Sequence, residues 1–297
     1  MKAIQSPLWT PCWILCLFLT VCRASVTVEV TPTVEAVKGE TAQLPCKYTI
    51  SPSVSNPIVE WYIKEEQGIR TRIAFKRNDE QGKSDDGTPL SGRVSIGDDL
   101  ALTISKVRPS DEFVFYCQVT AGPSGVGDAP TMLKVFFAPE KPVLTKPSSQ
   151  AISVGETTSS EVCMIGTCMS MNGHPQPRII WFKDDQPLPE VKDNRESMEY
   201  SPCVVKEASG LLTIKSTLYM QPTKADKDSV FRCTVEYSMP GDQIKQKKSD
   251  TININLNYPS EKATFSLTNT DPVKEGDNVI MKCETDGNPQ PEFDFTK

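Results

Sequence analysis

Ten cysteines and one histidine are the residues of this 297-residue chain whose types could do chemistry. A Ser-His-Asp or Cys-His nucleophile needs a histidine to accept the proton, and zinc sites built on several histidines need more than one. His174 stands in a Gly-His-Pro stretch, which is typical of a turn. We therefore expect no enzyme, no metal centre and no cofactor.

Two other patterns could hold ligands but lack the required spacing. Asp85-Asp86 and Asp98-Asp99 do not have the spacing of a calcium-binding EF-hand, so solvated turns are expected there. The glycines of residues 122–127 bracket a proline and do not form a phosphate-binding loop. The net charge of −6 and the absence of a basic run argue against nucleic acid as a partner.

The cysteines indicate disulfide chemistry in an oxidising compartment. Residues 1–24 combine a weakly basic start, an apolar run and small residues before Ala24, which predicts a signal peptide cleaved after that residue. Seven cysteines follow it, and an odd number in a secreted protein requires an explanation. We assign the extra one to Cys283, whose partner would lie in a third domain that this chain only begins. The chain is expected to be a fragment, with a natural short form as the alternative.

A cysteine, a tryptophan about fifteen residues later and a second cysteine are typical of an immunoglobulin-like sandwich, in which the tryptophan packs on an inter-sheet disulfide. We therefore predict an all-β protein of tandem immunoglobulin-like β-sandwiches. Residues 25–138 and 139–258 would each form a variable-type domain, and residues 259–297 would start a third. The pattern consists of Cys46, Trp61 and Cys117, then Cys168, Trp181 and Cys233, and begins again at Cys283.

Two features favour the variable type for the first domain. The 70 residues between Cys46 and Cys117 leave room for the extra strands of that type. Arg93 and Asp111 fit the ion pair expected at the base of such a domain, the alternative being two unrelated surface charges.

The second domain has two cysteines where one is expected. Strand alternation places Met164 and Gly166 in the core if Cys168 faces inward, whereas Cys163 facing inward would bury Glu161 unpaired. We therefore predict Cys168 as the inner cysteine, and the alternative joins Cys163 to Cys233. The predicted bridges are Cys46–Cys117, Cys168–Cys233 and an outward Cys163–Cys203.

The same alternation predicts an exposed face on the first domain. Apolar side chains occupy every second position of residues 59–63 and 115–119, so the intervening side chains should point outward. Tyrosine and arginine are enriched at binding hot spots, which makes this surface a candidate protein-binding face, and a merely solvated face is the alternative. Its predicted members are Glu60, Tyr62, Arg72, Tyr116 and Gln118.

Proline-containing junctions connect the units at residues 138–142 and 257–262. Because proline fixes φ and restrains its predecessor, we expect the first junction to be semi-rigid and the second, with one proline, to bend more. Acidic residues near Tyr258 make the second junction another candidate contact, for a basic ligand, and a merely solvated linker is the alternative.

Several short motifs resemble a known family. They are EASGLL at 207–212, YSMP at 237–240, NYPSE at 257–261 and DGNPQPEF at 286–293, with VEW at 59–61 and APE at 138–140. Together they resemble the adhesion-molecule family that includes basal cell adhesion molecule (the Lutheran glycoprotein) and its relative melanoma cell adhesion molecule. Residues 120–129 and 207–212 favour the basal form.

This resemblance implies a cell-surface receptor with a membrane anchor beyond the present chain. It would be a type I membrane glycoprotein. Its ligand would be laminin, bound near the second and third domains, or a receptor on another cell. No Asn-x-Ser/Thr glycosylation site occurs in this segment. The competing hypothesis is a secreted immunoglobulin-domain ligand or decoy, and both classes act through an extracellular protein partner.

Overall fold

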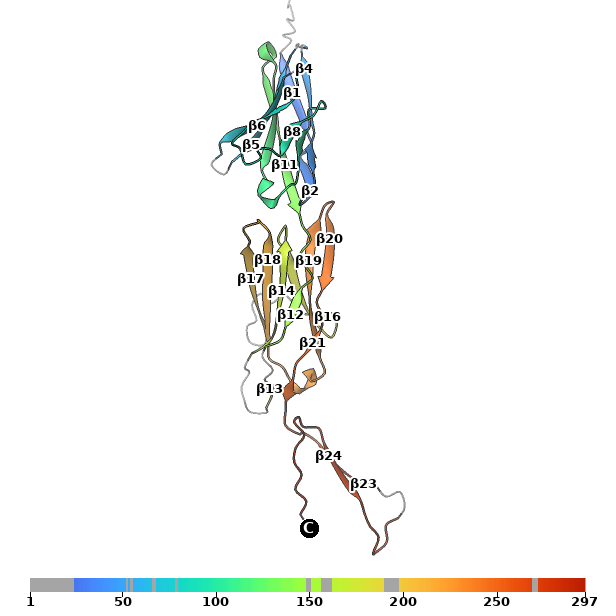
Figure 1. The fold of residues 1–297 in the computed structure, drawn as a ribbon. Helices are drawn as coiled ribbons and strands as arrows, with labels where there is room; N and C mark the ends of the chain where they lie inside the picture. The colour runs from blue at the N-terminus through green and yellow to red at the C-terminus, as the bar shows by residue number, and fades with distance from the viewer. Residues whose placement is uncertain are drawn as a thin grey trace, which may run out of the picture.

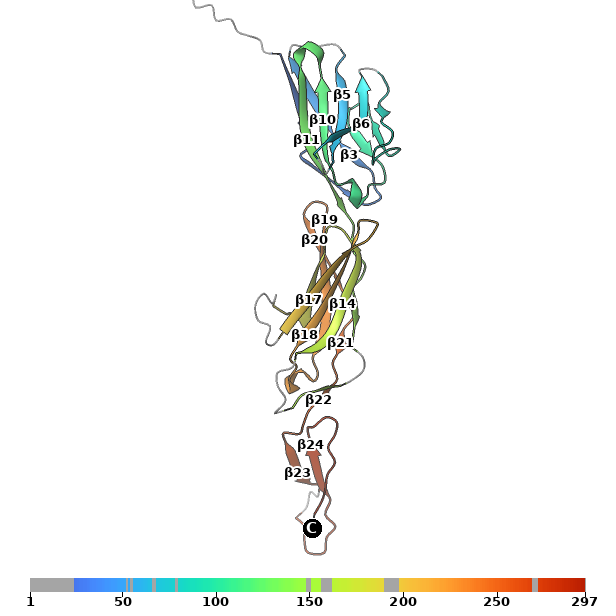
Figure 2. The same cartoon turned by 90° about the vertical axis from the view of Figure 1, so that its left-hand side faces the viewer.

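The computed structural model describes residues 24–51, 53, 56–65, 68–77, 80–147, 151–155, 162–189, 198–268 and 272–296. Figure 1 shows two β-sandwiches end to end, followed by a small two-stranded sheet, and Figure 2 shows the same order from the side. The regular structure of the described residues consists of strands and three short 3-10 turns. The predicted all-β class is confirmed. The described residues include no helix of sufficient length and apolar character to cross a membrane. The predicted signal segment lies outside the described residues, except for Ala24.

Two facing sheets build the first sandwich. One has the order β2-β11-β10-β5-β6-β7, and the other consists of β1-β4 and β3-β9-β8. Pro45 separates β3 from β4, as expected for a residue that cannot donate to a ladder. The strands are β1 (Ser25–Val30), β2 (Thr33–Val37), β3 (Ala42–Leu44), β4 (Cys46–Ser51), β5 (Ile58–Lys64), β6 (Arg70–Arg77), β7 (Lys83–Ser84), β8 (Val94–Ile96), β9 (Leu102–Ile104), β10 (Val114–Thr120) and β11 (Val126–Phe136).

The core of this sandwich forms around the predicted disulfide. Cys46 and Cys117 are bonded, and Trp61 lies directly opposite Cys117 on the neighbouring strand. The Trp61 indole is fully buried and donates from Nε1 to the carbonyl of Leu100 at 3.2 Å. The packing of tryptophan beside the bridge is therefore as predicted.

The predicted Arg93–Asp111 ion pair also forms. Its two nitrogen–oxygen distances are 2.6 and 2.7 Å, and Asp111 is buried in the 3-10 turn η1 (Pro109–Asp111). The buried carboxylate is thereby paired, because a guanidinium can donate two parallel hydrogen bonds to it.

The second sandwich has sheets β12-β14-β18-β17 and β16-β15-β19-β20, with β21 on β19 and β13 paired to β22. The long strand β17 pairs with β18, and only the two-residue β16 extends the other sheet. This arrangement differs from the predicted variable type. The strands are β12 (Val143–Thr145), β13 (Ile152–Ser153), β14 (Cys163–Gly173), β15 (Arg178–Lys183), β16 (Gln186–Pro187), β17 (Met198–Lys206), β18 (Leu212–Met220), β19 (Val230–Met239), β20 (Gln243–Lys248), β21 (Ile252–Asn253) and β22 (Leu256–Asn257).

Cys168 is the inner cysteine of this sandwich, as predicted. It is bonded to Cys233, and Trp181 lies opposite Cys233. A loop of this size, with a sequence separation of 65 between the cysteines, stabilises the fold by about 4 kcal/mol in the chain-entropy model. The prediction for Met164 is wrong. A bulge between Met164 and Gly166 turns Met164 outward and places Ile165 in the core, because a bulge shifts alternation by one residue. Glu161 lies outside the described residues.

The predicted Cys163–Cys203 bridge does not form. Cys163 lies opposite Met220 on one side of β18, and Cys203 lies opposite Lys215 on its other side. Five residues of strand correspond to about 17 Å, and a disulfide requires α-carbons within about 7 Å. The strand order therefore excludes this pairing without a large rearrangement.

The described part of the third unit is a two-stranded sheet. Strand β23 (Ala263–Leu267) pairs with β24 (Met281–Thr285), and Phe265 lies opposite Cys283. Cys283 forms no disulfide with another described residue. Several apolar side chains of this unit, including those of Phe265 and Met281, are exposed.

Candidate protein-binding face

The five predicted face residues lie together on the outer side of β10, β5 and β6. Tyr116 is opposite Tyr62, and Gln118 is opposite Glu60. Tyr62 is in turn opposite Arg72. The side chains between them, such as Trp61 and Cys117, are buried. Alternation therefore placed Glu60, Tyr62, Tyr116 and Gln118 on one surface correctly, because β5 and β10 are paired without a bulge. Arg72, expected beside them, lies on the neighbouring strand β6.

Arg72 is the centre of an ion-pair network on this face. Its Nε lies 2.8 Å from Asp85 Oδ2, and its Nη1 lies 2.9 Å from Glu60 Oε1. Hydrogen bonds to Asp85 and then to Glu60 raise the pKa of Arg72 above its ordinary value. Partial burial, followed by the charge and hydrogen bond of Glu60, raises the pKa of Tyr62. Arg72 stays charged, and the Tyr62 hydroxyl stays protonated at neutral pH.

Two arginines stack on aromatic rings of this face. The Arg70 guanidinium lies 3.6 Å from the ring centroid of Tyr116, and its Nη1 lies 2.6 Å from Asp128 Oδ2. Arg72 lies 4.5 Å from the ring centroid of Phe75. Exposed ion pairs contribute little stability, so their main effect is to hold the arginine and tyrosine side chains in one arrangement.

Sequence reasoning missed four contributors to this face: Arg70, Phe75, Asp85 and Asp128. An irregularity between β5 and β6 at Trp61 and Tyr62 breaks the alternation of β6, so Ile73 and Ala74 are both buried. As a result, the Phe75 side chain points outward, whereas simple alternation counted from Arg72 would point it into the core. Asp85, expected to be a solvated turn residue, reaches Arg72 because β7 pairs with β6.

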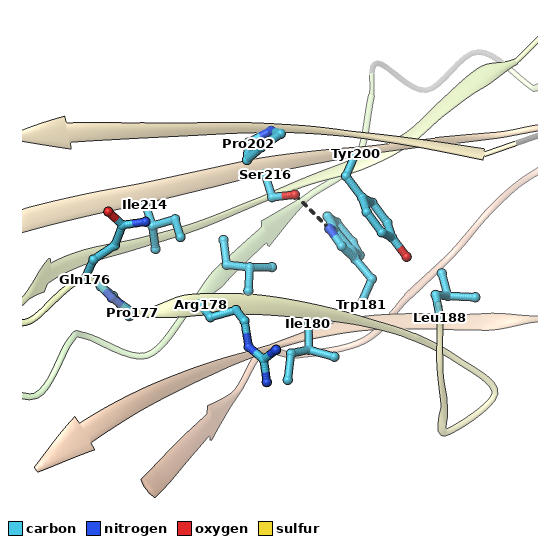
Figure 3. Close-up of a pocket in the computed structure, with 11 residues that line it drawn as sticks. Gln176, Pro177, Arg178, Ile180, Trp181, Leu188, Tyr200, Pro202, Ile214 and Ser216 are labelled. Carbon is cyan, nitrogen blue, oxygen red and sulfur yellow. Dashed lines mark hydrogen bonds between the residues drawn. The ribbon is translucent and has the colours of Figure 1, made fainter. Parts of the chain in front are cut away.

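A separate, mainly apolar cavity of about 360 Å³ opens between the sheets of the second sandwich. Figure 3 shows that β15 supplies one wall and that β17 and β18 supply the other. The dashed line marks the hydrogen bond from Trp181 Nε1 to Ser216 Oγ, 3.0 Å long. Tyr200 and Leu188 also line the cavity. Its walls consist largely of core side chains, and among the described residues Arg178 is the one charged residue that lines it.

The junction between the sandwiches is built from the turn that contains His174. His174 and Phe137 exchange backbone hydrogen bonds of 2.6 and 3.0 Å. His174 Nε2 lies 2.9 Å from Glu112 Oε2, so the histidine has a structural partner that the sequence did not reveal. Burial raises the pKa of Glu112, but hydrogen bonds from His174 and the Val135 amide outweigh it, and the pKa lies below its ordinary value.

The second junction repeats this construction. Tyr258 and Asn288 exchange backbone hydrogen bonds, and Lys224 Nζ lies 2.7 Å from Asp286 Oδ2 and 3.4 Å from Glu261 Oε2. The chain's own lysine thus occupies the position beside Glu261 that we expected a basic ligand to take. It also lies over the Tyr258 ring, 5.3 Å from the centroid.

Family models match both sandwiches. The immunoglobulin V-set domain model matches residues 29–136, and the CD80-like C2-set immunoglobulin domain model matches residues 148–244. The chain belongs to the immunoglobulin superfamily. The second domain thus matches a C2-set model and not the variable type that we predicted for it, and the strand order in which β17 joins β18 is consistent with that match.

Curated relatives of this chain include adhesion molecules, as the short motifs predicted. Basal cell adhesion molecule of Bos taurus is 32% identical over 282 residues, which is 92% of this chain and 44% of the relative. Cell surface glycoprotein MUC18 of Mus musculus is 35% identical, over 89% of this chain and 39% of the relative. Basal cell adhesion molecule of Homo sapiens is 32% identical over 91% of this chain. The chain spans less than half the length of these relatives.

Proposed function

We propose that this chain is the outer part of a cell-surface adhesion receptor and that the candidate face of its first domain contacts the ligand. The observation that carries the proposal is the surface formed by Tyr62, Tyr116, Arg70 and Arg72, in which both arginines are stacked on rings and paired with carboxylates. Such a preordered surface loses little side-chain entropy when a protein binds. Tyrosine and arginine are also the side chains enriched at hot spots.

The proposed ligand is laminin, placed here on the candidate face of the first domain instead of near the second and third domains, which is where the family resemblance implies laminin binding. A receptor on an opposing cell is the second candidate. The similarity to basal cell adhesion molecule and MUC18 favours an adhesion role. The second candidate has its own support in the exposed, self-complementary charges of the face, where each arginine stands beside an aspartate. Two copies could exchange such pairs across a two-fold axis.

Binding of residues 25–297 to immobilised laminins and to cells that display the same chain tests this proposal. The double variant Arg72→Ala with Tyr116→Ala should lower affinity about tenfold or more. The matched control, Gln43→Ala with Ser95→Ala, alters two exposed positions on the opposite sheet and should bind as the unchanged chain does.

Each outcome has a definite meaning. Binding to laminin supports the matrix receptor, and binding only to cells that display the chain supports self-adhesion. The ligand or decoy alternative is supported if the chain binds only another cell-surface protein and if a form without a membrane anchor produces the same response as an anchored form. An equal loss in the control pair would exclude the candidate face as the contact surface.

A further inference from the structure

A polar cleft of about 570 Å³ lies where the two sandwiches meet. Lys38, Arg108 and Glu112 line it from the first domain, and His174 and Lys206 line it from the second. The turn at residues 207–210, which belongs to one of the motifs of the family resemblance, forms part of its wall. The motif thus has a position in the structure that the candidate face does not explain.

The two domains are in close contact beside this cleft. A β-carbon built on Gly210 would lie 3.1 Å from Cβ of Pro109, and Gly210 has a φ of +80°. Glu112 and His174 are paired across the same boundary. The lining residues are therefore held near one another by direct contacts between the domains.

The cations of the cleft lack counter-charges. Arg93 and Lys224 each pair with a carboxylate. By contrast, Lys38, Arg108 and Lys206 form no ion pair with any residue that the structure describes. Lys38 Nζ lies 4.6 Å from the ring centroid of Phe137, a contact that leaves its charge unneutralised.

Both carboxylates of the cleft are already engaged. Glu112 accepts from the backbone amide of Val135 at 2.8 Å and pairs with His174. Glu207 accepts from Thr213 Oγ1 at 2.9 Å. The buried His174 Nδ1 has no hydrogen-bond partner among the described residues. The described lining of the cleft therefore has three cations and two carboxylates and is net positive, although the whole chain carries a net charge of −6.

We propose that this cleft binds an anionic sugar chain, through sulfate or carboxylate groups held by Lys38, Arg108 and Lys206. Its volume falls within the range of about 300–1,000 Å³ that is common for ligand sites. Its remaining described lining includes the hydroxyl groups of Ser110 and Ser209, and among the described lining residues the one aromatic side chain is that of His174. Such a surface suits a hydroxylated, charged ligand better than the apolar side chains of a peptide. Because cations from both domains contact the ligand, binding would also fix the angle between the domains.

Calorimetric titration of residues 25–297 tests the site with four oligosaccharides in about 150 mM salt. A heparin hexasaccharide presents sulfate and carboxylate, its desulfated form and a hyaluronan hexasaccharide present carboxylate alone, and a dextran oligomer is uncharged. The triple variant Lys38→Ala, Arg108→Ala, Lys206→Ala should lose at least tenfold in affinity for the anionic sugars. Binding of the desulfated or hyaluronan probe identifies carboxylate as sufficient, and binding of heparin alone identifies sulfate as required.

A matched triple variant separates the cleft from general attraction. Lys47→Ala, Lys64→Ala and Lys248→Ala remove the same charge from exposed positions outside the cleft and should change affinity less than threefold. An equal loss in both triple variants would overturn the proposal. So would the absence of binding to every anionic sugar, or equally tight binding of a poly-glutamate peptide at the same site.

A variant that binds more tightly than the unchanged chain would show that the losses of affinity are not caused by misfolding. Glu207→Gln removes a negative charge beside the three cations and should raise affinity severalfold, whereas Glu29→Gln, on the exposed side of β1, should leave it unchanged. An unfolded variant could not gain affinity. Unchanged or weaker binding by Glu207→Gln would contradict a site in this cleft.

Discussion

At the scale of single residues, several buried polar groups of this chain have partners far away in the sequence. Trp181 donates to Ser216 inside the second sandwich, and Asp226 holds the turn η3 (Lys224–Asp226) that precedes β19. Asp226 accepts from the Thr223 amide and also pairs with Lys183. Asp226 corresponds in position to Asp111 of the first domain, but its cation, Lys183, comes from the end of β15.

Ser216→Ala should destabilise the second domain by about 1–3 kcal/mol, because the buried indole N–H of Trp181 loses its acceptor. Urea unfolding followed by tryptophan fluorescence measures the change. Ser95→Ala, at an exposed position of β8, is the matched control and should shift stability by less than about 0.5 kcal/mol. Equal effects of the two changes would show that the hydrogen bond of Figure 3 contributes nothing.

Asp226→Asn should destabilise the protein at neutral pH, and the difference should disappear in acid. Burial raises the pKa of Asp226, but hydrogen bonds from Lys183 and Thr223 outweigh it, so the folded pKa lies below its ordinary value. The unfolded carboxyl titrates near pH 4. The stabilisation is therefore complete above that pH and is lost as the pH falls through the folded pKa. Urea midpoints at pH 7, 5 and 3 test this, with exposed Asp228→Asn as the control. A difference that persists unchanged at pH 3 would contradict it.

At the scale of elements, turns with a left-handed backbone decide how the domains approach one another. The turn at residues 207–210 joins β17 to β18 and ends at Gly210, which packs against Pro109 of η1. Glycine adopts a positive φ without a steric penalty. Any side chain at this position would add both backbone strain and a close contact with the first domain.

Gly210→Ala should cost about 1 kcal/mol of stability and also disturb the contact between the domains. Gly87 has a φ of +75° and no atom within 4 Å of its built β-carbon, so Gly87→Ala carries the same strain without the contact. Both variants should unfold at lower urea concentration, but only Gly210→Ala should change the small-angle scattering profile. Identical profiles for the two variants would show that the Gly210 contact does not set the domain arrangement.

At the scale of the whole molecule, both junctions use one construction. In each, a linker aromatic residue pairs with the second residue of a Gly-x-Pro-Gln-Pro turn, as Phe137 does with His174 and Tyr258 does with Asn288. A side-chain contact then connects the following domain to the preceding one, between His174 and Glu112 at the first junction and as an ion pair between Asp286 and Lys224 at the second. The elongated arrangement in Figures 1 and 2 thus depends on charged contacts as well as on linker prolines.

His174→Ala should loosen the first junction, because Glu112 loses its partner across the boundary. Lys224→Ala is the matched change at the second junction, where Asp286 loses its partner. Residual dipolar couplings should show a changed orientation between residues 25–138 and 139–258 only for His174→Ala, and between residues 139–258 and 259–296 only for Lys224→Ala. Unchanged couplings in either variant would show that the ion pair at that junction is dispensable.

The sequence by itself determined the all-β class, the two inner disulfides and the outward face of the first domain. These follow from residue type and from alternation with a period of two, which any regular strand must obey. Cys46, Cys168 and Tyr62 could therefore be placed correctly without coordinates. The motifs also identified the adhesion-molecule relatives.

Only the tertiary structure decided which strands are neighbours, where alternation breaks and what lies across a domain boundary. A bulge reversed the prediction for Met164, and the position of β18 between β14 and β17 separated Cys163 from Cys203. The Glu112–His174 pair and the cationic cleft join residues about 60 or more positions apart. Such contacts depend on how two separately folded domains pack, and local periodicity carries no information about that packing.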